Sequence, residues 1–518
     1  MADLPELGIG IDVGGTNTDA VMLDAQGRVI AKAKRPTTPE VTEGLRAALD
    51  AVLAELGDAQ HRVTRVMLGT THATNAILER RNLGRVAVLR LGAPATTSVP
   101  PLSGWPDDLR KAVSAGETIV AGGHYVDGRE IRPPDLGAIR RFLDGVDADA
   151  VAVTSVFSPA GGEHERLVEE LVRAEYGLPV SLSHEIGSLG LLERENATVL
   201  NAALYGVAAH VTGALVAALA ERDLRARPYL AQNDGTLMTL EHAARLPVST
   251  IGSGPANSLR GAAYLSGVTD AIVVDVGGTS TDLGVLAGGF PRESAAAVEI
   301  GGVLTNFRMP DILAIALGGG TVVREQGIGP DSVGYRIVRE ALVFGGSTAT
   351  MTDAAVAAGR TPPGEPGWRA RLGDMSEGIA DMLERAVAVA DEMVIDAVDR
   401  MALGKSDRPL VAVGGGAFVL PERVPGAGPV IRPQHAEVAN AVGAAIALAS
   451  GRVDTILPAG DSRSEAIEKA KEEAAARAVA AGADPSAVEI VDLLEVPLSY
   501  LSEPAVRVHV KAAGPLAR

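Results

Sequence analysis

A short segment that could bind phosphate occurs twice in this chain. Residues 12–19 read DVGGTNTD and residues 275–282 read DVGGTSTD, with one residue changed. Each copy follows an apolar stretch typical of a strand, so an acid stands at a strand end and glycines and hydroxyls follow it. Two such loops predict that one nucleotide is held from opposite sides, as in a two-lobed phosphotransferase or ATPase.

The residue types in both loops suit Mg-ATP. Glycine lets the backbone approach phosphate oxygens, and hydroxyls can donate to them. Mg²⁺ prefers a few carboxylates plus phosphate, so we expect Asp12 and Asp275 to hold it. Asp19 and Asp282 either bind the ion indirectly, through its direct ligands, or stabilise the turn. The candidate phosphate-binding residues are Gly14, Gly15, Thr16, Asn17 and Thr18 in the first loop and Gly277, Gly278, Thr279, Ser280 and Thr281 in the second. The alternative is two glycine-rich turns in a duplicated structural motif.

A third glycine-rich element, Gly414, Gly415 and Gly416, ends a predicted buried strand at 409–413. Three glycines permit flat contact with an adenine or a ribose, although a tight strand-to-helix turn would explain them as well. The two loops upstream favour nucleoside binding. Residues 318–321, GGGT, form a similar loop with less context.

Composition narrows the class of protein. The 518 residues carry a net charge of −18 and only 3% aromatics, which argues against a nucleic-acid partner. No cysteine is present, so disulfides, thiolate catalysis and Cys-ligated zinc are excluded. No signal peptide is visible, and the apolar stretch 199–220 is expected to be a buried helix, with no membrane contact. The cytoplasm is therefore the expected location.

The elements that position these loops predict an α/β protein. Strand, hairpin, helix, strand is the order of a ribonuclease-H-like lobe, and it recurs around the second loop. Residues 92–117 are expected to be an irregular insertion, the helix near 196–221 to begin the second lobe, and 435–450 to be a final helix. Residues beyond about 455 predict a small α/β unit. We expect the units 1–190 for the first lobe, 191–453 for the second, and 454–518 for the C-terminal unit.

Several longer segments carry a resemblance to a known family. They are GIDVGGTNTDAVMLD (10–24), GTTHATNAILER (69–80), ERENATVLNAAL (193–204), GSGPANSLRGAAYLSG (252–267), VDVGGTSTDL (274–283), GPDSVG (329–334) and TMTDA (350–354). In this order they resemble the A-type subunit of the hydantoinase/oxoprolinase family, which belongs to the actin/Hsp70/sugar-kinase fold group. The resemblance implies two actin-like lobes that close on a nucleotide.

The resemblance also implies an activity. Members that open lactams are thought to use ATP to phosphorylate the carbonyl oxygen of a cyclic amide such as a hydantoin or oxoproline, with a B-type subunit helping hydrolysis. Related members carboxylate ketones with the same ATP chemistry. A B-type partner or a homo-oligomer is therefore expected. From another class, a non-catalytic nucleotide switch of the actin or Hsp70 kind stays open.

Departures from the family pattern leave the substrate side open. The larger hydantoinase subunits usually have His-Gly-Thr-Thr where this chain has Leu68, Gly69, Thr70 and Thr71, with His72 one position further on. Val343-Phe344-Gly345-Gly346 replaces their Cys-Tyr-Gly-Arg run before Gly-Gly. The chain is also shorter than those subunits, so it resembles a compact branch of the family whose substrate need not be a hydantoin or oxoproline.

The acceptor side is predicted from loop residues of the first lobe. Thr70, Thr71, His72 and His124 are candidate catalytic residues, and the two histidines could ligate a second divalent metal, Zn or Mn, or polarise the substrate carbonyl. Histidines bonded to backbone are the alternative. His164 and Glu165 are expected to be a helix-surface pair.

Overall fold

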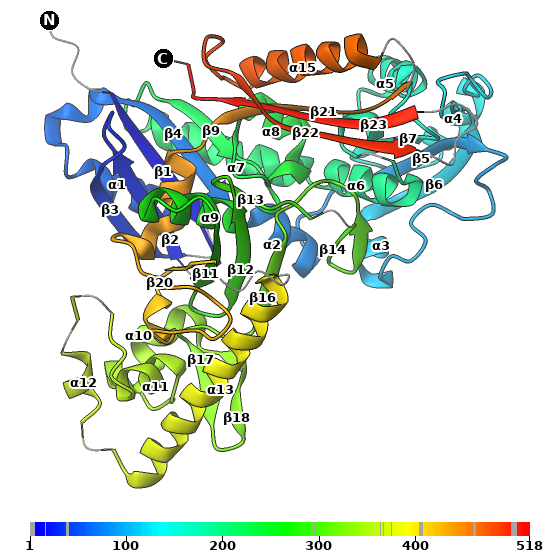
Figure 1. Cartoon of the computed structure of the whole chain (residues 1–518). Helices are drawn as coiled ribbons and strands as arrows, with labels where there is room; N and C mark the ends of the chain where they lie inside the picture. The colour runs from blue at the N-terminus through cyan, green and yellow to red at the C-terminus, as the bar shows by residue number, and fades with distance from the viewer. Residues whose placement is uncertain are drawn as a thin grey trace, which may run out of the picture.

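A nine-stranded, a six-stranded and a four-stranded sheet organise the computed structural model (Figure 1). The structure describes residues 6–15, 17–37, 41–187, 189–294, 297–362, 364–365, 367–373, 375–402, 408–458, 463–498 and 505–517. The nine-stranded sheet has the order β22 (Glu489–Leu498), β23 (Ala505–Gly514), β21 (Ala449–Pro458), β10 (Leu237–Thr239), β9 (Arg227–Ala231), β4 (Val63–Thr70), β1 (Leu7–Val13), β2 (Asn17–Leu23) and β3 (Val29–Pro36).

The other two sheets belong to the second lobe and to an inserted unit. The six-stranded sheet has the order β13 (Phe290–Pro291), β12 (Thr281–Ala287), β11 (Ala271–Val276), β19 (Leu410–Val413) and β20 (Val430–Ile431), with β16 (Ile312–Ile315) also paired to β12. The four-stranded sheet has the order β6 (Ser114–Ala121), β5 (Val86–Ala93), β7 (Ala150–Ser155) and β8 (Val180–Leu182). Two hairpins pair β14 (Val298–Ile300) with β15 (Val303–Thr305) and β17 (Thr321–Arg324) with β18 (Gly327–Ser332).

Helices cover these sheets. They are α1 (Val41–Leu53), α2 (His72–Glu79), α3 (Asp107–Val113), α4 (Leu136–Leu143), α5 (Glu163–Tyr176), α6 (Leu191–Ala203), α7 (Tyr205–Ala220), α8 (Leu240–Arg245), α9 (Ser253–Ser266), α10 (Ile337–Glu340), α11 (Met351–Ala357), α12 (Trp368–Arg371), α13 (Glu377–Ala402), α14 (Ala439–Ala445) and α15 (Arg463–Ala480). We call α3–α5 with β5–β8 the inserted unit, because the chain leaves the first lobe after α2 and returns to it with α7 and β9.

The first lobe is built on the hairpin β1–β2. Strand β1 is almost continuously apolar because helices cover both faces of the sheet. Leu45 of α1 and Leu215 of α7 pack against one face, and Val442 of α14 packs against Val21 and Leu23 on the other. Antiparallel β1–β2–β3 with parallel β4 and β9 confirms the ribonuclease-H-like lobe.

The second lobe repeats this plan. Strand β11 pairs antiparallel with β12 and parallel with β19, as β1 pairs with β2 and β4. Helix α13 buries a stripe spaced by three and four residues against one face, which is the pattern of an amphipathic helix. Leu259 and Ala262 of α9 pack on the opposite face. Helices α9 and α14 also pack against each other, so they join the two lobes.

Three local predictions were wrong. Residues 92–117 contain α3 and the first half of β6, which pairs parallel to β5, so part of this insertion is regular. The helix expected near 196–221 is two helices, α6 and α7, which are bent by 48° and pack on the inserted unit and the first lobe. The helix expected at 435–450 is only α14, because Ala449 already pairs in β21.

The C-terminal α/β unit continues the first lobe's sheet. Strand β21 pairs with β10 and with β23, and Figure 1 shows these strands running across the top of the molecule from the first lobe toward the inserted unit. The nine-stranded sheet therefore contains strands from all three units predicted from the sequence, 1–190, 191–453 and 454–518. Within the described ranges, no single helix is long and apolar enough to span a membrane, and the bent pair α6–α7 would qualify only by joint length and composition.

Candidate functional site

The two repeated segments fold in the same way. Asp12 pairs across the hairpin with Asp19, and Asp275 pairs with Asp282 at the matching register of β11–β12. The Gly14 amide donates to the Asn17 carbonyl at 3.0 Å, and the Gly277 amide donates to the Ser280 carbonyl at 2.9 Å. The two copies, which are nearly identical in sequence, therefore also form the same turn.

The helices between the lobes bring these loops together. Asn440 of α14 donates to Asp12 Oδ2 at 3.4 Å and lies close enough to Asp275 to lower the pKa of that carboxyl against the stronger effect of burial. On α9, Asn257 lies beside Asp12 and Ser258 beside Asp275. The two aspartates thus share one set of neighbours, although they lie 263 positions apart in the sequence.

The carboxylates form a site that favours a cation. Burial, followed by the charge of Asp19 and then that of Asp275, raises the pKa of Asp12 to about 7, although hydrogen bonds from neighbouring amides oppose the rise. Burial, followed by the charge of Asp275, likewise raises the pKa of Asp282 to about 7. Asp12 Oδ1 is buried and has no hydrogen-bond partner among the described residues. A divalent cation would supply that missing partner, so the donor set fits Mg²⁺.

Lys34 is a cation at the site that the sequence reasoning missed. Its ammonium donates to both oxygens of Asp19, at 2.8 and 2.7 Å, and to the carbonyl of Glu437 at 3.1 Å. The burial of Asp19 raises its pKa, and Lys34 opposes that rise. Lys34 comes from β3 while Glu437 precedes α14, so no local pattern connects them.

The loop hydroxyls divide into two groups. Thr18 and Thr281 are fully buried, and Thr281 donates to the Leu317 carbonyl at 2.5 Å. Both therefore face the protein interior, and this disagrees with the predicted contact to phosphate. Thr279 and Ser280 are exposed on the second loop and face outward. Thr16 lies outside the described residues, and the Asn17 carbonyl closes the first turn.

The third glycine-rich element packs against the second loop. Gly416 donates to the Val276 carbonyl at 2.8 Å, and Gly414 has a φ of +87°. A Cβ on Gly414 would lie 2.3 Å from Asp275 Oδ1, so only glycine fits here. A Cβ on Gly415 would lie 3.7 Å from Lys34 Cε, which brings this element near the first lobe. Contact with the nucleoside stays a prediction. The amides of Gly319 and Gly320 donate to the Gly277 and Gly278 carbonyls and so stabilise the same loop.

Thr70 and Thr71 lie beside the first loop, as predicted residues of one site should. Thr70 pairs with Val13 in register, and the Thr71 amide donates to the Val13 carbonyl at 3.3 Å. Gly69 lies opposite Asp12 and leaves room for Asp12 Oδ1. The end of β4 therefore belongs to the candidate site.

His72 and His124 are not brought together. His72 hydrogen-bonds to the Thr70 hydroxyl and lines a small apolar pocket against α7, where burial and then the charge of His210 lower its pKa to about 4. His124 lies in the inserted unit with its ring 4.1 Å from that of His164. Among the described residues, no group of three or more His, Asp or Glu could hold a metal ion. The second metal that we predicted therefore has no support in this geometry.

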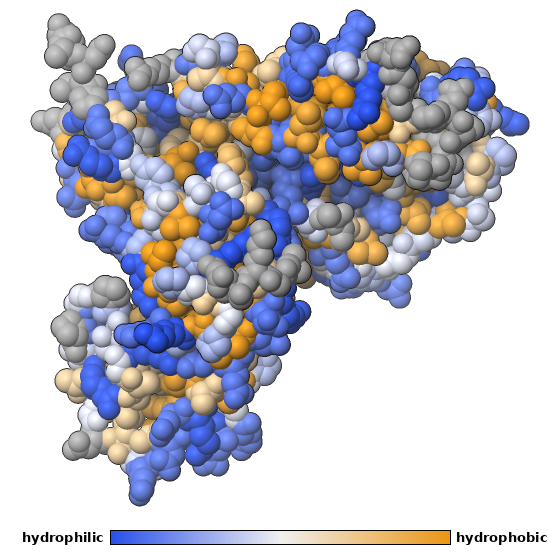
Figure 2. All heavy atoms as spheres, viewed as in Figure 1, coloured by the Kyte–Doolittle hydropathy of each residue, from blue (hydrophilic) through white to orange (hydrophobic). Residues whose placement is uncertain are grey.

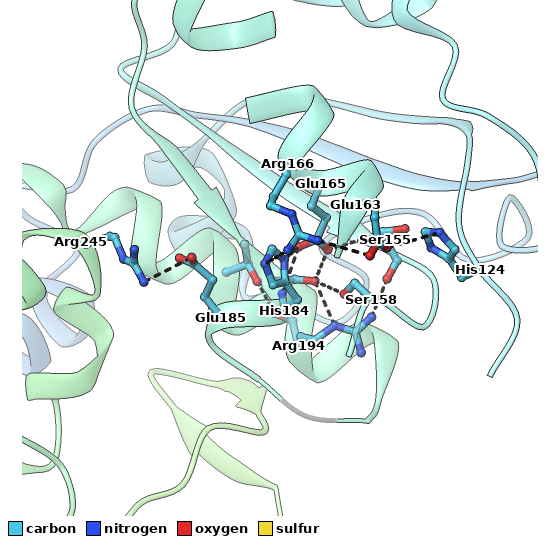
Figure 3. Close-up of polar contacts among 12 residues, drawn as sticks. His124, Ser155, Ser158, Glu163, Glu165, Arg166, His184, Glu185, Arg194 and Arg245 are labelled. Atoms are coloured by element: carbon cyan, nitrogen blue, oxygen red, sulfur yellow. Dashed lines mark hydrogen bonds and ion pairs between the residues drawn. The ribbon is translucent and has the colours of Figure 1, made fainter. Parts of the chain in front are cut away.

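The pair His164–Glu165 was predicted wrongly as a helix surface. Both residues are buried, and His164 accepts from the Gly123 amide at 3.0 Å. Arg194, from a segment of the resemblance, is also buried and donates to the Ser155 carbonyl at 2.6 Å. Glu165 belongs to a polar network around His184 (Figure 3).

Comparisons with known proteins agree with this geometry. Residues 8–176 match the family model described as the hydantoinase/oxoprolinase N-terminal region, and residues 194–453 match the model described as hydantoinase/oxoprolinase. The caprolactamase alpha subunit of Pseudomonas jessenii is 29% identical over 68% of this chain and 54% of its own length. The acetophenone carboxylase gamma subunit of Aromatoleum aromaticum is 28% identical over 68% of this chain and 53% of its own. The chain thus spans about half the length of these relatives.

Solved structures share the fold. The ATP-dependent caprolactamase from Pseudomonas jessenii aligns with a TM-score of 0.75 at 20% identity, over 99% of this chain and 88% of that chain. Nucleotide-free acetone carboxylase aligns with a TM-score of 0.68 at 18% identity, over the same shares. The fold is that of the actin-like ATPases. Since one family model alone covers half of the sequence, the chain belongs to the hydantoinase/oxoprolinase family.

Proposed function

We propose that this chain is the ATP-dependent subunit of an enzyme that phosphorylates the carbonyl oxygen of a cyclic amide and so prepares the ring for hydrolysis. One observation carries the proposal: two equivalent loops, one from each lobe, bring Asp12 and Asp275 close to the same side chain, that of Asn440. Such a pair of loops suits a single polyphosphate bridged between the lobes.

Different residues of the chain would contact the phosphates, add positive charge and hold the metal ion. Thr279 and Ser280 present free hydroxyls to phosphate, and the backbone at Gly15 leaves the first loop open. Lys34 adds a positive charge beside Asp19. Mg²⁺, held by Asp12 and Asp275 together with phosphate oxygens, would neutralise charge on the transferred group. Positioning and charge neutralisation are what phosphoryl transfer mainly needs.

Phosphorylation solves the chemical problem of an unstrained amide, which is a poor electrophile. The carbonyl oxygen forms a bond to the γ-phosphorus of ATP while the bond to ADP breaks. Water then adds to the carbon, and the ring C–N bond breaks to leave an acyl phosphate and a free amine. A second water attacks the acyl carbon, and phosphate leaves with the former carbonyl oxygen. ATP, lactam and two waters thus give ADP, phosphate and a ring-opened amino acid.

The second candidate function directs the same activation at a ketone. The similarity to acetophenone carboxylase and to the acetone carboxylase beta subunit of Xanthobacter autotrophicus, 25% identical over 68% of this chain, favours it. In that case the chain would be the ATP-dependent subunit of a carboxylase.

A substrate panel separates these functions. Phosphate release from Mg-ATP is measured with ε-caprolactam, hydantoin or oxoproline, and with acetone or acetophenone plus bicarbonate, each with and without a B-type subunit. We expect a cyclic amide to raise turnover at least about tenfold. With an ¹⁸O-labelled carbonyl, the label should appear in phosphate. A response to ketone and bicarbonate alone would favour the carboxylase, and a response only to a protein would contradict both and indicate a nucleotide switch.

A B-type partner is part of the proposal, because the relatives in the comparison are subunits. The edge strand β22 leaves Ile490, Leu493, Leu494 and Val496 exposed, and Figure 2 shows apolar residues along the C-terminal strands at the top of the molecule. An exposed apolar edge strand is a typical contact surface. We propose that the B-type subunit covers it. Full turnover by the isolated chain would contradict this requirement, and a self-associated chain would assign the surface to a second copy.

Replacing Gly15 with alanine tests whether the first loop contacts phosphate. A Cβ at Gly15 has no heavy atom of the described chain within 4 Å, so we expect an unchanged Tm. If phosphate occupies this space, the methyl group should raise KM for ATP at least about tenfold, or ~1.4 kcal/mol. Gly213→Ala on α7, which is equally open in the described chain, is the matched control. An unchanged KM in both variants would refute the contact.

The raised pKa of Asp12 predicts a pH effect on stability. An ordinary aspartate has a pKa of about 3.9, so folding disfavours the ionised form of Asp12. The stability that protonated Asp12 contributes at low pH is therefore lost as pH rises through about 7. We expect Asp12→Asn to gain stability relative to the wild-type chain between pH 5 and 7.5, measured by thermal melts without nucleotide. Asp282 is present in both proteins, so its titration affects both stabilities equally and cancels in the difference. A stability difference that is constant over this pH range would contradict the assignment.

A further inference from the structure

Two adjoining cavities, separate from the glycine-rich loops, lie between the inserted unit, the C-terminal strands and α15. Their volumes are about 520 and 650 Å³. The residues that line both include His184, Phe307, Arg308, Arg452 and Arg477. Elements from three parts of the chain thus form one polar space large enough for a small molecule.

The lining of the larger cavity carries more basic than acidic side chains, although Arg308 is paired with Glu293 at 3.1 Å and Arg477 with Glu473 at 2.5 Å. That lining includes the five arginines Arg166, Arg245, Arg308, Arg452 and Arg477 but only the two acids Glu185 and Glu241. Arg452 is 3.8 Å from Asp234, whose nearer partner is Lys511 at 2.8 Å, so its charge is incompletely paired. Burial, followed by the charges of neighbouring arginines, lowers the pKa of His242 to about 4. This lining suits an anion.

His184 presents a proton acceptor to the same space. Its Nδ1 donates to Glu165 at 2.6 Å, which leaves Nε2 as the acceptor. Glu165 is completely buried and also accepts from Ser155 N at 2.7 Å, Ser183 Oγ at 2.5 Å and His184 N at 3.0 Å. Figure 3 shows the ring of His184 held between this carboxylate and the guanidinium of Arg166. The ring orientation is therefore fixed, and the long 3.5 Å contact from Arg166 Nη1 to Nε2 leaves room for a shorter hydrogen bond from an N–H or O–H group.

The cavity adjoins the edge of the sheet that carries the first loop. Strands β1, β4 and β9 are parallel, so their carboxyl ends lie along one edge. Asn233, just after β9, lines the larger cavity and accepts from the Gly252 amide at 2.8 Å. The next residue, Ser253, donates to the Thr70 carbonyl at 3.1 Å. Hydrogen bonds through Asn233 and the start of α9 therefore link the cavity wall to the end of β4.

We propose that this cavity binds a small organic carboxylate that also carries an N–H or O–H group, with Arg308 and Arg452 facing the carboxylate and His184 accepting from the donor. Glu165 positions His184. That this molecule accepts the phosphoryl group rests on the proposed function, whereas its binding does not.

The test measures equilibrium binding without nucleotide, by calorimetry on the full chain. N-acetylglycinate is the probe, since it joins a carboxylate to an amide N–H. N-acetylglycinamide lacks the charge, and 4-oxopentanoate replaces the N–H by CH₂. We expect both analogues to bind at least about tenfold more weakly than the probe. Phosphate and bicarbonate are run as competitors, and displacement by either at equal concentration would assign the site to an inorganic anion and overturn the proposal.

Variants assign the contacts. Arg452→Gln should weaken N-acetylglycinate binding at least about tenfold, while Lys511 still pairs with Asp234 and keeps the fold. Arg400→Gln, on the exposed end of α13, removes the same charge elsewhere and should change nothing. His184→Leu should abolish the preference for N-acetylglycinate over 4-oxopentanoate without changing 4-oxopentanoate affinity. Equal affinities in the wild-type chain and Arg452→Gln would overturn the proposal.

The outcomes keep this inference apart from the proposed function. Failure of N-acetylglycinate to bind, in a chain that still hydrolyses Mg-ATP, would refute the cavity and leave the phosphate loops intact. Binding by a chain that shows no ATP turnover either alone or with a B-type subunit would support the cavity and refute the proposed function.

Discussion

Asp12→Asn and Asp275→Asn are each expected to lower Mg-ATP hydrolysis at least about 10³-fold, since each removes a ligand charge where phosphoryl transfer depends on it. The two aspartates occupy equivalent registers and share Asn440, so neither should replace the other. Asparagine preserves shape, and the amide carries no charge to bury. The measurement is steady-state phosphate release as a function of Mg²⁺, with circular dichroism as the check on folding.

The matched control is Asp396→Asn on α13, an exposed carboxylate 3.7 Å from Arg400. It changes the net charge equally and should keep wild-type turnover. Normal turnover in either loop variant, with a folded chain, would refute the assignment of that loop. Loss in one variant only would mean that a single lobe holds the metal.

Gly414→Ala is expected to be the most damaging single methyl group near the site. Gly414 has a φ of +87°, and its Cβ would lie 2.3 Å from Asp275 Oδ1 and 2.4 Å from the Val276 carbonyl. Backbone strain and displacement of Asp275 should together cost about 2–4 kcal/mol of stability and most of the ATPase activity. Denaturant unfolding gives the free energy of unfolding, and phosphate release gives the activity.

Gly415→Ala is the neighbouring control. Within the described part of the chain, its Cβ would meet only Lys34 Cε, at 3.7 Å, which is an ordinary contact. We expect wild-type stability there, with a raised KM for ATP if the nucleoside lies against this element. Equal stability of Gly414→Ala and the wild-type chain would contradict the packing described for Asp275.

The repeated octapeptide predicted the site as far as local sequence can. It placed both hairpins, both acids and both turns, because an acid, two glycines and hydroxyls after an apolar strand have one consistent geometry. It misassigned Thr18 and Thr281, which lie on strands and point to the interior. Alternation along the strand, rather than residue type, decides which hydroxyl faces out.

The missed residues come from distant elements. Asn257, Ser258 and Asn440 reach the aspartates only because α9 and α14 pack between the lobes. Lys34 reaches Asp19 across one strand pair, but a lysine on a strand is usually exposed and gives no signal. The cavity around His184 needs the inserted unit and the C-terminal strands together, and no window of sequence contains both.

The fold was predictable at the level of hairpins and lobes, and less so for their connections. Helices α6 and α7 form one apolar run in sequence, yet a break at Leu204 sends them to different units. Strands β9 and β10 were not predicted, because they are short and pair with partners far along the chain. The family match gives the order of units, and pairing decides which sheet each strand joins.

The most direct test of the central claim is a crystal structure of the chain with Mg²⁺ and a non-hydrolysable ATP analogue. The account predicts the β- and γ-phosphates between the turns at Gly14–Asn17 and Gly277–Ser280, with Mg²⁺ or its water ligands contacting both Asp12 and Asp275. A nucleotide bound elsewhere, or one that contacts a single loop, would contradict it.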